Sequence, residues 1–357
     1  MEAARMQKLR QAMETRGLTA VLISNPVNRR YMTGFTGSAG VAVITANDAW
    51  LLTDFRYKVQ APMQARYYEV VEHGPKLTDT LRDLLSRSGI RQLGFEQDYV
   101  SYGEYLKYKQ ELPNVELVPV AGIVEDLRQI KDEAELKIMR EAAAIADQAF
   151  SHILNRIRPG MTEREVALEL ETFMRANGAK GPSFDTIVAS GPRSALPHGT
   201  ASDKPLAAGE LVTFDFGAYY QGYCSDLTRT VMLGKPTEKH REIYEIVREA
   251  QALTLERLKP GMSGWEADAV AREWITRAGY GDCFGHGTGH GLGMEIHEAP
   301  RLSVTGDIIL QPGMVVTVEP GIYIPDFGGV RIEDDVVITD TGIELLTHSD
   351  KQWTVIE

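Results

Sequence analysis

The stretch Ile157-Arg-Pro-Gly-Met-Thr162 recurs later in the chain as Leu258-Lys-Pro-Gly-Met-Ser263, and this repeat decides the fold prediction. In each copy we expect a helix to end at Pro-Gly and the following Thr or Ser to cap a new helix. Each copy is followed by one of a second pair of similar stretches, Gly209–Gly217 after the first copy and Gly313–Gly321 after the second. Two copies are too few for a solenoid. The repeat therefore predicts one domain of two similar halves, with helices and antiparallel strands in each, and a functional cleft that receives matched residues from both.

Residues 1–124 show helical and strand-like patterns in alternation, which is typical of an α/β domain. Helices are expected at 2–16, 55–65, 77–88 and 101–111, and strands at 20–25, 41–45, 50–54, 67–72, 92–96 and 115–120. A single long helix is expected near 126–157. We therefore predict an α+β protein with a smaller α/β domain over 1–124 and a larger domain of two related halves over 125–357.

Composition narrows the class of protein. The chain has 357 residues, of which 38 are Lys or Arg and 50 are Asp or Glu, so its net charge is -12. This disfavours nucleic acid as a partner, because nucleic-acid binding needs a basic surface. Cys224 and Cys283 are too few for a disulfide framework or a thiolate metal cluster. Met1–Ala20 lacks the apolar segment of a signal peptide, and no apolar run approaches the ~18 residues of a membrane span, so we expect a cytoplasmic protein that does not cross a membrane.

The first acidic pair lies in a predicted hairpin. In the strand 211–217, apolar residues mark one face as core, and Asp215 lies on the other face. If the turn centres on Tyr220-Gln221, Asp215 lies directly opposite Asp226, with Cβ atoms ~5 Å apart. Two carboxylates at that distance repel by about 3 kcal/mol at an effective dielectric of roughly 20. Either one of them takes a proton or a cation lies between them.

The second half repeats this arrangement. Glu319 is expected to share one face of a strand with Val315 and Thr317. After the loop Ile324–Gly329, the return strand carries Arg331, Glu333 and Asp335 on one face, so the two glutamates are expected to oppose each other. Acidic residues in strands are usually solvated, but the apolar neighbours of Asp215 indicate a core strand. Four carboxylates from two related hairpins are hard oxygen ligands, which suit two divalent cations about 3.5–4 Å apart.

Histidines in Gly- and Pro-rich stretches are the other candidates. Gly285-His-Gly-Thr-Gly-His-Gly-Leu-Gly293 lacks the G-x-G-x-x-G spacing and the lysine of phosphate-binding loops. His290 is the best imidazole ligand, because Mn, Co and Zn accept one nitrogen among oxygens. His198 and His297 hold matched positions in the two halves, and they are expected to contact the substrate or a developing oxyanion.

These residues resemble a known metallopeptidase family. The set Asp215, Asp226, His290, Glu319 and Glu333 is similar to the five-ligand centre of the methionyl aminopeptidase, aminopeptidase P and prolidase superfamily, whose "pita-bread" fold has pseudo-twofold symmetry. The resemblance is to the Xaa-Pro peptidase branch in particular, and it extends into the N-terminal domain. The motifs are Asn28–Gly40, Leu52–Tyr57, Leu196-Pro-His-Gly199, Gly285–Gly291, His297-Glu298, Glu319-Pro-Gly321 and Arg331-x-Glu333.

The resemblance implies a role for each residue. Asp215 binds one metal, Asp226 and Glu333 bridge, and His290 and Glu319 bind the other metal. The two cations, of which Mn is favoured over Co or Zn, activate a water molecule, and Glu319 also relays a proton to the departing nitrogen. The remaining residues contact the substrate or the ligands: His198 and His297 hold the substrate and intermediate, His286 lines the proline side, and Arg331 pairs with carboxylates. A homodimer is also implied.

Several alternatives remain open within and beyond this family. A dipeptidase (prolidase) needs a cation for the substrate's terminal carboxylate, and Arg301 is a candidate, which favours dipeptides over the longer peptides that aminopeptidase P cleaves. Methionyl aminopeptidase ordinarily lacks the N-terminal domain, and creatinase lacks the acidic ligands. A non-catalytic peptide-binding module typically has eroded ligands, whereas all five are present here.

Overall fold

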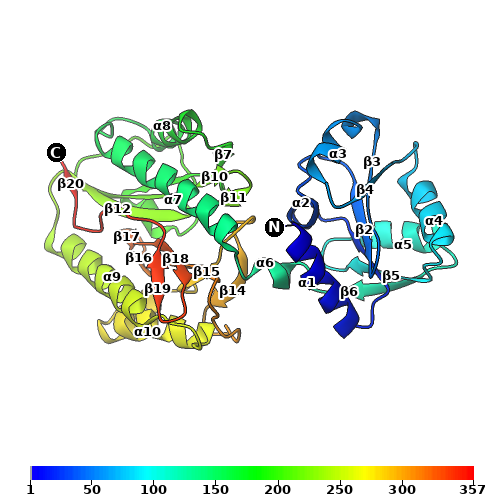
Figure 1. Cartoon of the computed structure of the whole chain (residues 1–357). Coiled ribbons are helices and arrows are strands. Elements are labelled where there is room, and N and C mark those ends of the chain that lie inside the picture. Colours follow the sequence, from blue (N-terminus) through cyan, green and yellow to red (C-terminus); the bar gives the residue numbers. More distant parts are fainter. Residues whose placement is uncertain (1) are drawn as a thin grey trace. The chain divides into compact units, whose positions relative to one another are not determined.

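The computed structural model describes residues 2–357 and divides into two compact units. The first unit ends at Arg128, and the second runs from Gln129 to Glu357. Each unit has its own hydrophobic core. Figure 1 shows the helices and strands of both units.

The first unit is a six-stranded sheet with helices, in the strand order β4-β3-β2-β1-β5-β6. The strands are β1 (Ala20–Ile23), β2 (Val41–Thr45), β3 (Ala49–Thr53), β4 (Glu69–Glu72), β5 (Gln92–Glu96) and β6 (Glu116–Val120). The helices are α1 (Glu2–Thr15), α2 (Pro26–Thr33), η1 (Phe55–Tyr57), α3 (Gln60–Gln64), α4 (Leu77–Arg87), α5 (Tyr102–Glu111) and α6 (Glu125–Arg128). All six predicted strands are present. The sequence analysis did not predict α2, although Asn25 caps it, Pro26 begins it and Gly34 ends it with a left-handed φ of 73°.

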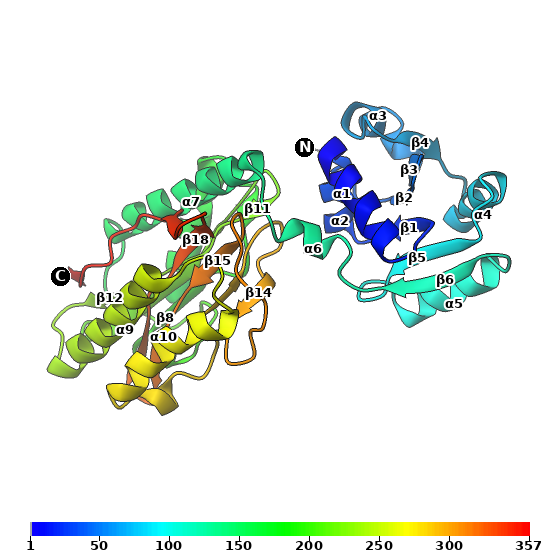
Figure 2. The same cartoon turned by 60° about the horizontal axis from the view of Figure 1, so that its bottom comes forward.

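The second unit contains the repeat. Its helices are α7 (Glu133–Leu154), α8 (Glu163–Ala176), η2 (Gly191–Ala195), α9 (Glu238–Arg257), α10 (Gly264–Arg277) and η3 (Gly281–Cys283). Thr162 and Ser263 cap α8 and α10 through the same reciprocal bonds, with Glu165 and Glu266 respectively. The two halves therefore begin alike, as the repeat predicted. Helices α7 and α8 lie on one side of the strands and α9 and α10 on the other (Figures 1 and 2).

Two larger sheets of the second unit carry the acidic residues. One has the order β20-β12-β9-β8 and the other β14-β13-β15-β18-β19, and the sheets β11-β10-β7 and β16-β17 are smaller. The strands are β7 (Gly181–Pro182), β8 (Ile187–Ser190), β9 (Glu210–Phe216), β10 (Ala218–Tyr220), β11 (Tyr223–Cys224), β12 (Leu227–Leu233), β13 (Gly289–Gly291), β14 (Glu298–Leu302), β15 (Val315–Val318), β16 (Gly321–Ile324), β17 (Gly328–Arg331), β18 (Asp334–Ile338), β19 (Ile343–Leu345) and β20 (Val355–Ile356). This is the predicted α+β architecture.

One predicted helix is wrong. The single helix expected near 126–157 is two helices, because the chain is extended at Asp132, whose side chain accepts hydrogen bonds from the backbone N–H groups of Ala134 and Glu135. Glu135 bonds back to the N–H of Asp132, and this capping box starts α7 anew.

The cores confirm the predicted faces of β9. Val212, Phe214 and Phe216 pack in the cluster under α7 and α8, whereas Leu211 belongs to the cluster under α9 and α10. By strand alternation, Asp215 shares the face of Leu211.

None of the helices in residues 2–357 combines the length and apolarity that a bilayer crossing requires.

Candidate metal centre

The first acidic hairpin has a different register from the predicted one. Asp215 on β9 pairs with Thr228 on β12, not with Asp226. The turn is Gln221-Gly222, one residue later than expected, and both residues have left-handed φ values, 48° and 101°. This conformation matches the twist of a tight hairpin. Because the register moves by two residues, Asp226 keeps the predicted face and is a diagonal neighbour of Asp215.

The second acidic pair lies as predicted. Val318 pairs with Asp334 on one side, and Gly321 pairs with Arg331 on the other. Both pairs belong to one register, which places Glu319 opposite Glu333. The return loop is short, and Asp326 at its centre has a left-handed φ of 62°.

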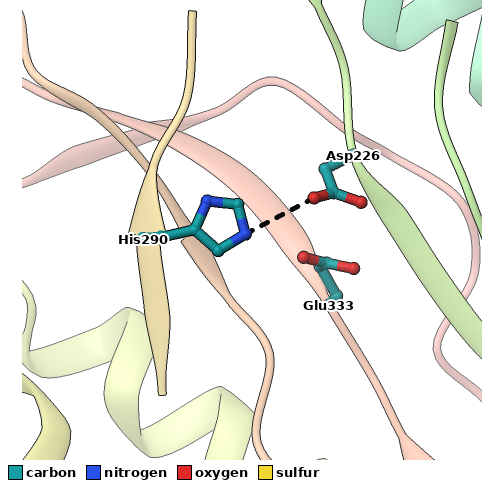
Figure 3. A group of neighbouring side chains, drawn as sticks. All are labelled: Asp226, His290 and Glu333. Atoms are coloured by element: carbon teal, nitrogen blue, oxygen red, sulfur yellow. Dashed lines mark ion pairs between the residues drawn. The ribbon is translucent and has the colours of Figure 1, made fainter. Parts of the chain in front are cut away.

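Three ligand groups meet in the interior: His290 lies on β13, Asp226 lies between β11 and β12, and Glu333 lies between β17 and β18. Ligand atoms of Asp226, His290 and Glu333 all lie within 4.8 Å of one another (Figure 3). The His290 Nε2 atom is 3.6 Å from Asp226 Oδ2 and 3.3 Å from Glu319 Oε1. Asp215 joins through Arg331, whose Nη2 donates to Asp215 Oδ2 at 2.5 Å.

Unpartnered oxygen atoms show that this cluster suits cations. Asp226 Oδ1 and Glu333 Oε1 are buried, and neither has a hydrogen-bond partner in residues 2–357. A buried carboxylate oxygen without a partner is costly unless a proton or a cation satisfies it. Carboxylate oxygens with one imidazole are a donor set for divalent cations such as Mn, Co or Zn. The residues present therefore fit the two divalent cations that the sequence analysis expected.

Hydrogen bonds from neighbouring residues orient the metal ligands. Thr228 Oγ1 donates to Glu333 Oε2 at 2.6 Å, and the backbone N–H of Asp226 donates to Asp335 Oδ2 at 2.8 Å. The sequence analysis assigned no role to Thr228 or Asp335. Strand alternation did place Asp335 on the same face as Glu333, and that was the available signal.

The tautomer of His290 follows from its contacts. Its Nδ1 lies 3.0 Å from the carbonyl oxygen of Gly291, so Nδ1 carries the proton and Nε2 presents a lone pair to the carboxylates. Burial lowers the pKa of His290 to about 4, which keeps the ring neutral. A neutral imidazole with a free Nε2 is the form that binds a metal.

His286 lies in a different network. Its Nδ1 is 2.7 Å from the carbonyl oxygen of Gly287, so its Nε2, 2.8 Å from the Tyr323 hydroxyl, accepts a hydrogen bond. Tyr323 in turn accepts one from Arg331 Nη1 at 2.8 Å. Both ring nitrogens of His286 are therefore engaged, and the ring lines the cavity without a free polar atom. The sequence analysis missed Tyr323.

The glycines around His290 let neighbouring backbone approach closely. Gly289 and Gly291 lie on strand β13. A Cβ atom on Gly289 would come within 1.9 Å of the Thr317 carbonyl oxygen, and one on Gly291 within 2.2 Å of the Ala299 carbonyl oxygen. The glycines thus let neighbouring backbone pack against the strand that carries His290.

All the predicted site residues line one cavity of about 550 Å³. They are His198, Asp215, Asp226, His286, His290, His297, Arg301, Glu319, Arg331 and Glu333. Phe184, Ile187, Pro197 and Ile296 provide apolar walls. His297 packs edge-on against His290 with ring centroids 4.5 Å apart, and burial lowers its pKa.

The carboxyl groups carry raised pKa values in the metal-free protein. Burial, and then the neighbouring carboxylates, raise the pKa of Asp226 and Glu333 well above the ordinary range. Burial raises the pKa of Glu319 to about 7. A raised pKa means that the folded chain holds the proton more tightly than the unfolded chain does. The stability from Glu319 is therefore complete below its unfolded pKa of 4.5 and is lost as the pH rises through about 7.

We expect the metal-free protein to lose thermal stability as the pH rises from about 4.5 to about 7, because over this range the unfolded chain releases the Glu319 proton whereas the folded chain still holds it. Divalent cations should reverse the trend, since they bind the deprotonated carboxylates and neutralise their repulsion. Calorimetry in EDTA and in MnCl₂ at each pH measures both effects. A metal-free unfolding temperature that rises over this range would contradict the assignment.

Comparison with known proteins agrees with this geometry. Residues 137–340 match the family model described as metallopeptidase family M24, and residues 5–130 match that of the creatinase/prolidase N-terminal domain. The Xaa-Pro dipeptidase of Pyrococcus furiosus is 43% identical over 348 residues, which cover 98% of this chain and 99% of that protein. The solved structure of an Xaa-Pro dipeptidase from Bacillus anthracis is 52% identical, with a TM-score of 0.98 and 100% of both chains covered. That of an X-Pro aminopeptidase from Thermotoga maritima is 40% identical, with a TM-score of 0.92, and covers 97% of this chain and 100% of that one.

Proposed function

Since this chain belongs to metallopeptidase family M24, we propose that it hydrolyses Xaa-Pro bonds, with dipeptides as its preferred substrates. The observation that supports this proposal is the buried pair Asp226 and Glu333, whose unpartnered oxygens lie beside His290 in an open cavity. The names of the relatives in Pyrococcus furiosus and Bacillus anthracis point to the same substrate class. The catalytic role belongs to the second predicted domain, residues 125–357.

The ligands proposed for two divalent cations are Asp215, Asp226, His290, Glu319 and Glu333. Such cations would polarise a peptide carbonyl and supply a nucleophile from water at neutral pH. Mn is favoured over Co or Zn, because oxygen ligands dominate the set.

The chain's own residues position the substrate and move protons. His198 and His297 have exposed rings on the cavity wall, where they can donate to the carbonyl oxygen of the substrate or of the intermediate. The Glu319 carboxyl, with its pKa raised to about 7 by burial in the metal-free protein, is suited to pass a proton to the departing proline nitrogen. Arg331 holds Asp215 and, through Tyr323, His286.

A proline substrate suits this kind of site. The proline nitrogen has no N–H, so an enzyme that must bind that group loses a partner there. The cavity instead has apolar lining residues, and the ring of His286 lines it too, with its polar atoms already engaged. A ring can pack on that wall without leaving a polar group unsatisfied.

Arg301 supports a preference for dipeptides over the longer substrates of aminopeptidase P. Its backbone pairs with His290 across β13 and β14, and its side chain is exposed to the cavity and forms no ion pair or hydrogen bond within residues 2–357. The terminal carboxylate of Xaa-Pro is a natural partner for such a cation. In Xaa-Pro-Ala the same carboxylate lies one residue further away.

We expect Arg301→Met to raise the KM for Leu-Pro by roughly 10- to 100-fold, the range for a lost charge-assisted hydrogen bond. Leu-Pro-amide, which lacks the carboxylate, is the matched control and should lose much less. Steady-state kinetics with Mn, Co and Zn in turn measure both substrates and identify the preferred metal. Faster cleavage of Leu-Pro-Ala than of Leu-Pro by the wild-type protein would identify it as an aminopeptidase instead. Metal bound without hydrolysis of any peptide would indicate a binding module.

We also propose that the protein is a homodimer located in the cytoplasm. Sedimentation of the purified chain tests the oligomeric state, and a monomer with full activity would remove the dimer from it.

A further inference from the structure

Two charged residues of the cavity lie outside the metal centre. Besides the histidines, the acidic ligands and Arg331, the charged residues that line it are Asp185 and Arg301. Both side chains are exposed, and neither forms an ion pair or a hydrogen bond within the part of the chain that the structure describes. Arg301 is already proposed to bind the substrate's carboxylate. Asp185 has the opposite charge and no assigned partner.

Asp185 and Arg301 come from different halves of the unit. Asp185 lies in the bend between β7 and β8, two residues before Ile187, which pairs with Asp215 on the next strand. Arg301 lies on β14, where it pairs with His290. The two charges therefore reach one cavity from different halves of the unit. If the carboxylate of a dipeptide meets Arg301, its first residue is free to contact the half that carries Asp185.

We propose that Asp185 is a specificity residue that binds a cationic side chain, lysine or arginine, in the substrate residue before proline. The inference rests on the proposed Xaa-Pro activity. Phe184 and Ile187, which line the same wall, would pack against the methylene groups of such a side chain while its charged end reaches Asp185.

Asp185 is more exposed than the metal ligands, and this difference favours a substrate side chain over the substrate's α-ammonium group as the partner of Asp185. The ligands Asp226 and Glu333 are 4% and 1% exposed, and Ile187 is 5% exposed, whereas Asp185 is exposed. A group held close to the scissile bond lies among the buried residues. A long side chain that leaves this region meets Asp185 further out. Electrostatic attraction there also disfavours aspartate or glutamate before proline, because like charges repel.

The test compares Lys-Pro, Leu-Pro and Glu-Pro with the Mn-loaded protein. For Asp185→Asn, the ratio of kcat/KM for Lys-Pro to that for Leu-Pro should fall by roughly two- to tenfold, the range for a solvent-accessible ion pair. The ratio for Glu-Pro to Leu-Pro should rise over the same range. Asp185→Lys should invert the preference, so that Glu-Pro exceeds Lys-Pro. High salt should weaken the wild-type preference in the same direction.

Asp203→Asn is the matched control, because Asp203 is also an exposed aspartate but pairs with Arg164 and does not line the cavity. It should change neither ratio. An equal fall for all three dipeptides in Asp185→Asn would show that Asp185 binds the common α-ammonium or only supports the loop, and would overturn the inference. Unchanged ratios would overturn it as well. If the wild-type protein cleaves none of the dipeptides, the proposed Xaa-Pro activity itself fails, which is a distinct result.

Discussion

Glu333→Ala is expected to reduce kcat/KM for Leu-Pro by about a thousandfold or more and to lower the metal content of the purified protein. A catalytic cation contributes several kcal/mol of transition-state stabilisation, and each 1.36 kcal/mol corresponds to about tenfold in rate. Glu333 is 1% exposed, and its Oε1 has no partner in residues 2–357, so this oxygen is available to a cation. Removing it leaves the centre with one fewer negative charge and one fewer ligand.

Elemental analysis and steady-state kinetics measure the two effects together. Glu344→Ala is the control, because Glu344 is a glutamate of the same half but lies on the surface, where it pairs with Arg140. Glu333→Gln keeps the side-chain volume and a hydrogen-bond acceptor for Thr228, so it separates loss of a ligand from loss of structure. A folded Glu333→Ala protein that contains no metal and still cleaves Leu-Pro at the wild-type rate would refute the metal-dependent mechanism.

The acidic hairpins show which parts of a site a sequence pattern can predict. Alternation placed Asp215 and Asp226 on one face correctly, because the side-chain period of a strand does not depend on the rest of the fold. The register was wrong, because it depends on where the turn lies, and Gln221 adopts a left-handed φ that a glutamine rarely has. Glu319 and Glu333 were paired correctly, because one register continues from the pair Val318 and Asp334 to the pair Gly321 and Arg331 on either side of them.

The supporting residues could not be predicted in the same way, because their partners are distant in the sequence. Thr228 donates to Glu333, more than a hundred residues later, and no local pattern of β12 indicates this. Asp268 on α10 accepts hydrogen bonds from the backbone and side chain of Thr288, and Arg272 binds the same carboxylate and the carbonyl oxygen of His286. Helix α10 thus holds the loop between His286 and His290 in place, although its sequence has the pattern of an ordinary amphipathic surface helix.

Arg229 is a residue whose importance the sequence pattern indicated, although no prediction was made from it. It is a charged residue within the otherwise uncharged strand β12, and it is 1% exposed. Its Nη2 donates to Asp334 Oδ1 and to the Ser349 carbonyl oxygen, each at 2.7 Å. Its Nη1 donates to the carbonyl oxygens of Thr228 and Glu333. Arg229 therefore ties the backbone of both halves together directly behind the metal ligands.

Arg229→Met is expected to lower the free energy of unfolding of the second unit by about 3–5 kcal/mol, the usual cost of removing one partner of a buried ion pair. The methionine fills much of the volume, but carbonyl oxygens of Thr228, Glu333 and Ser349 lose a donor. Denaturant titration followed by tryptophan fluorescence measures the change, because Trp265, Trp274 and Trp353 lie in this unit. Arg140→Met is the matched control: Arg140 pairs with Glu133 and Glu344, but its side chain is 35% exposed, so its loss should cost less than about 1 kcal/mol. Equal losses in the two variants would mean that the buried pair does not connect the halves. A greater loss in Arg229→Met, together with weaker Mn binding, would show that the same contact that stabilises the fold also positions Glu333.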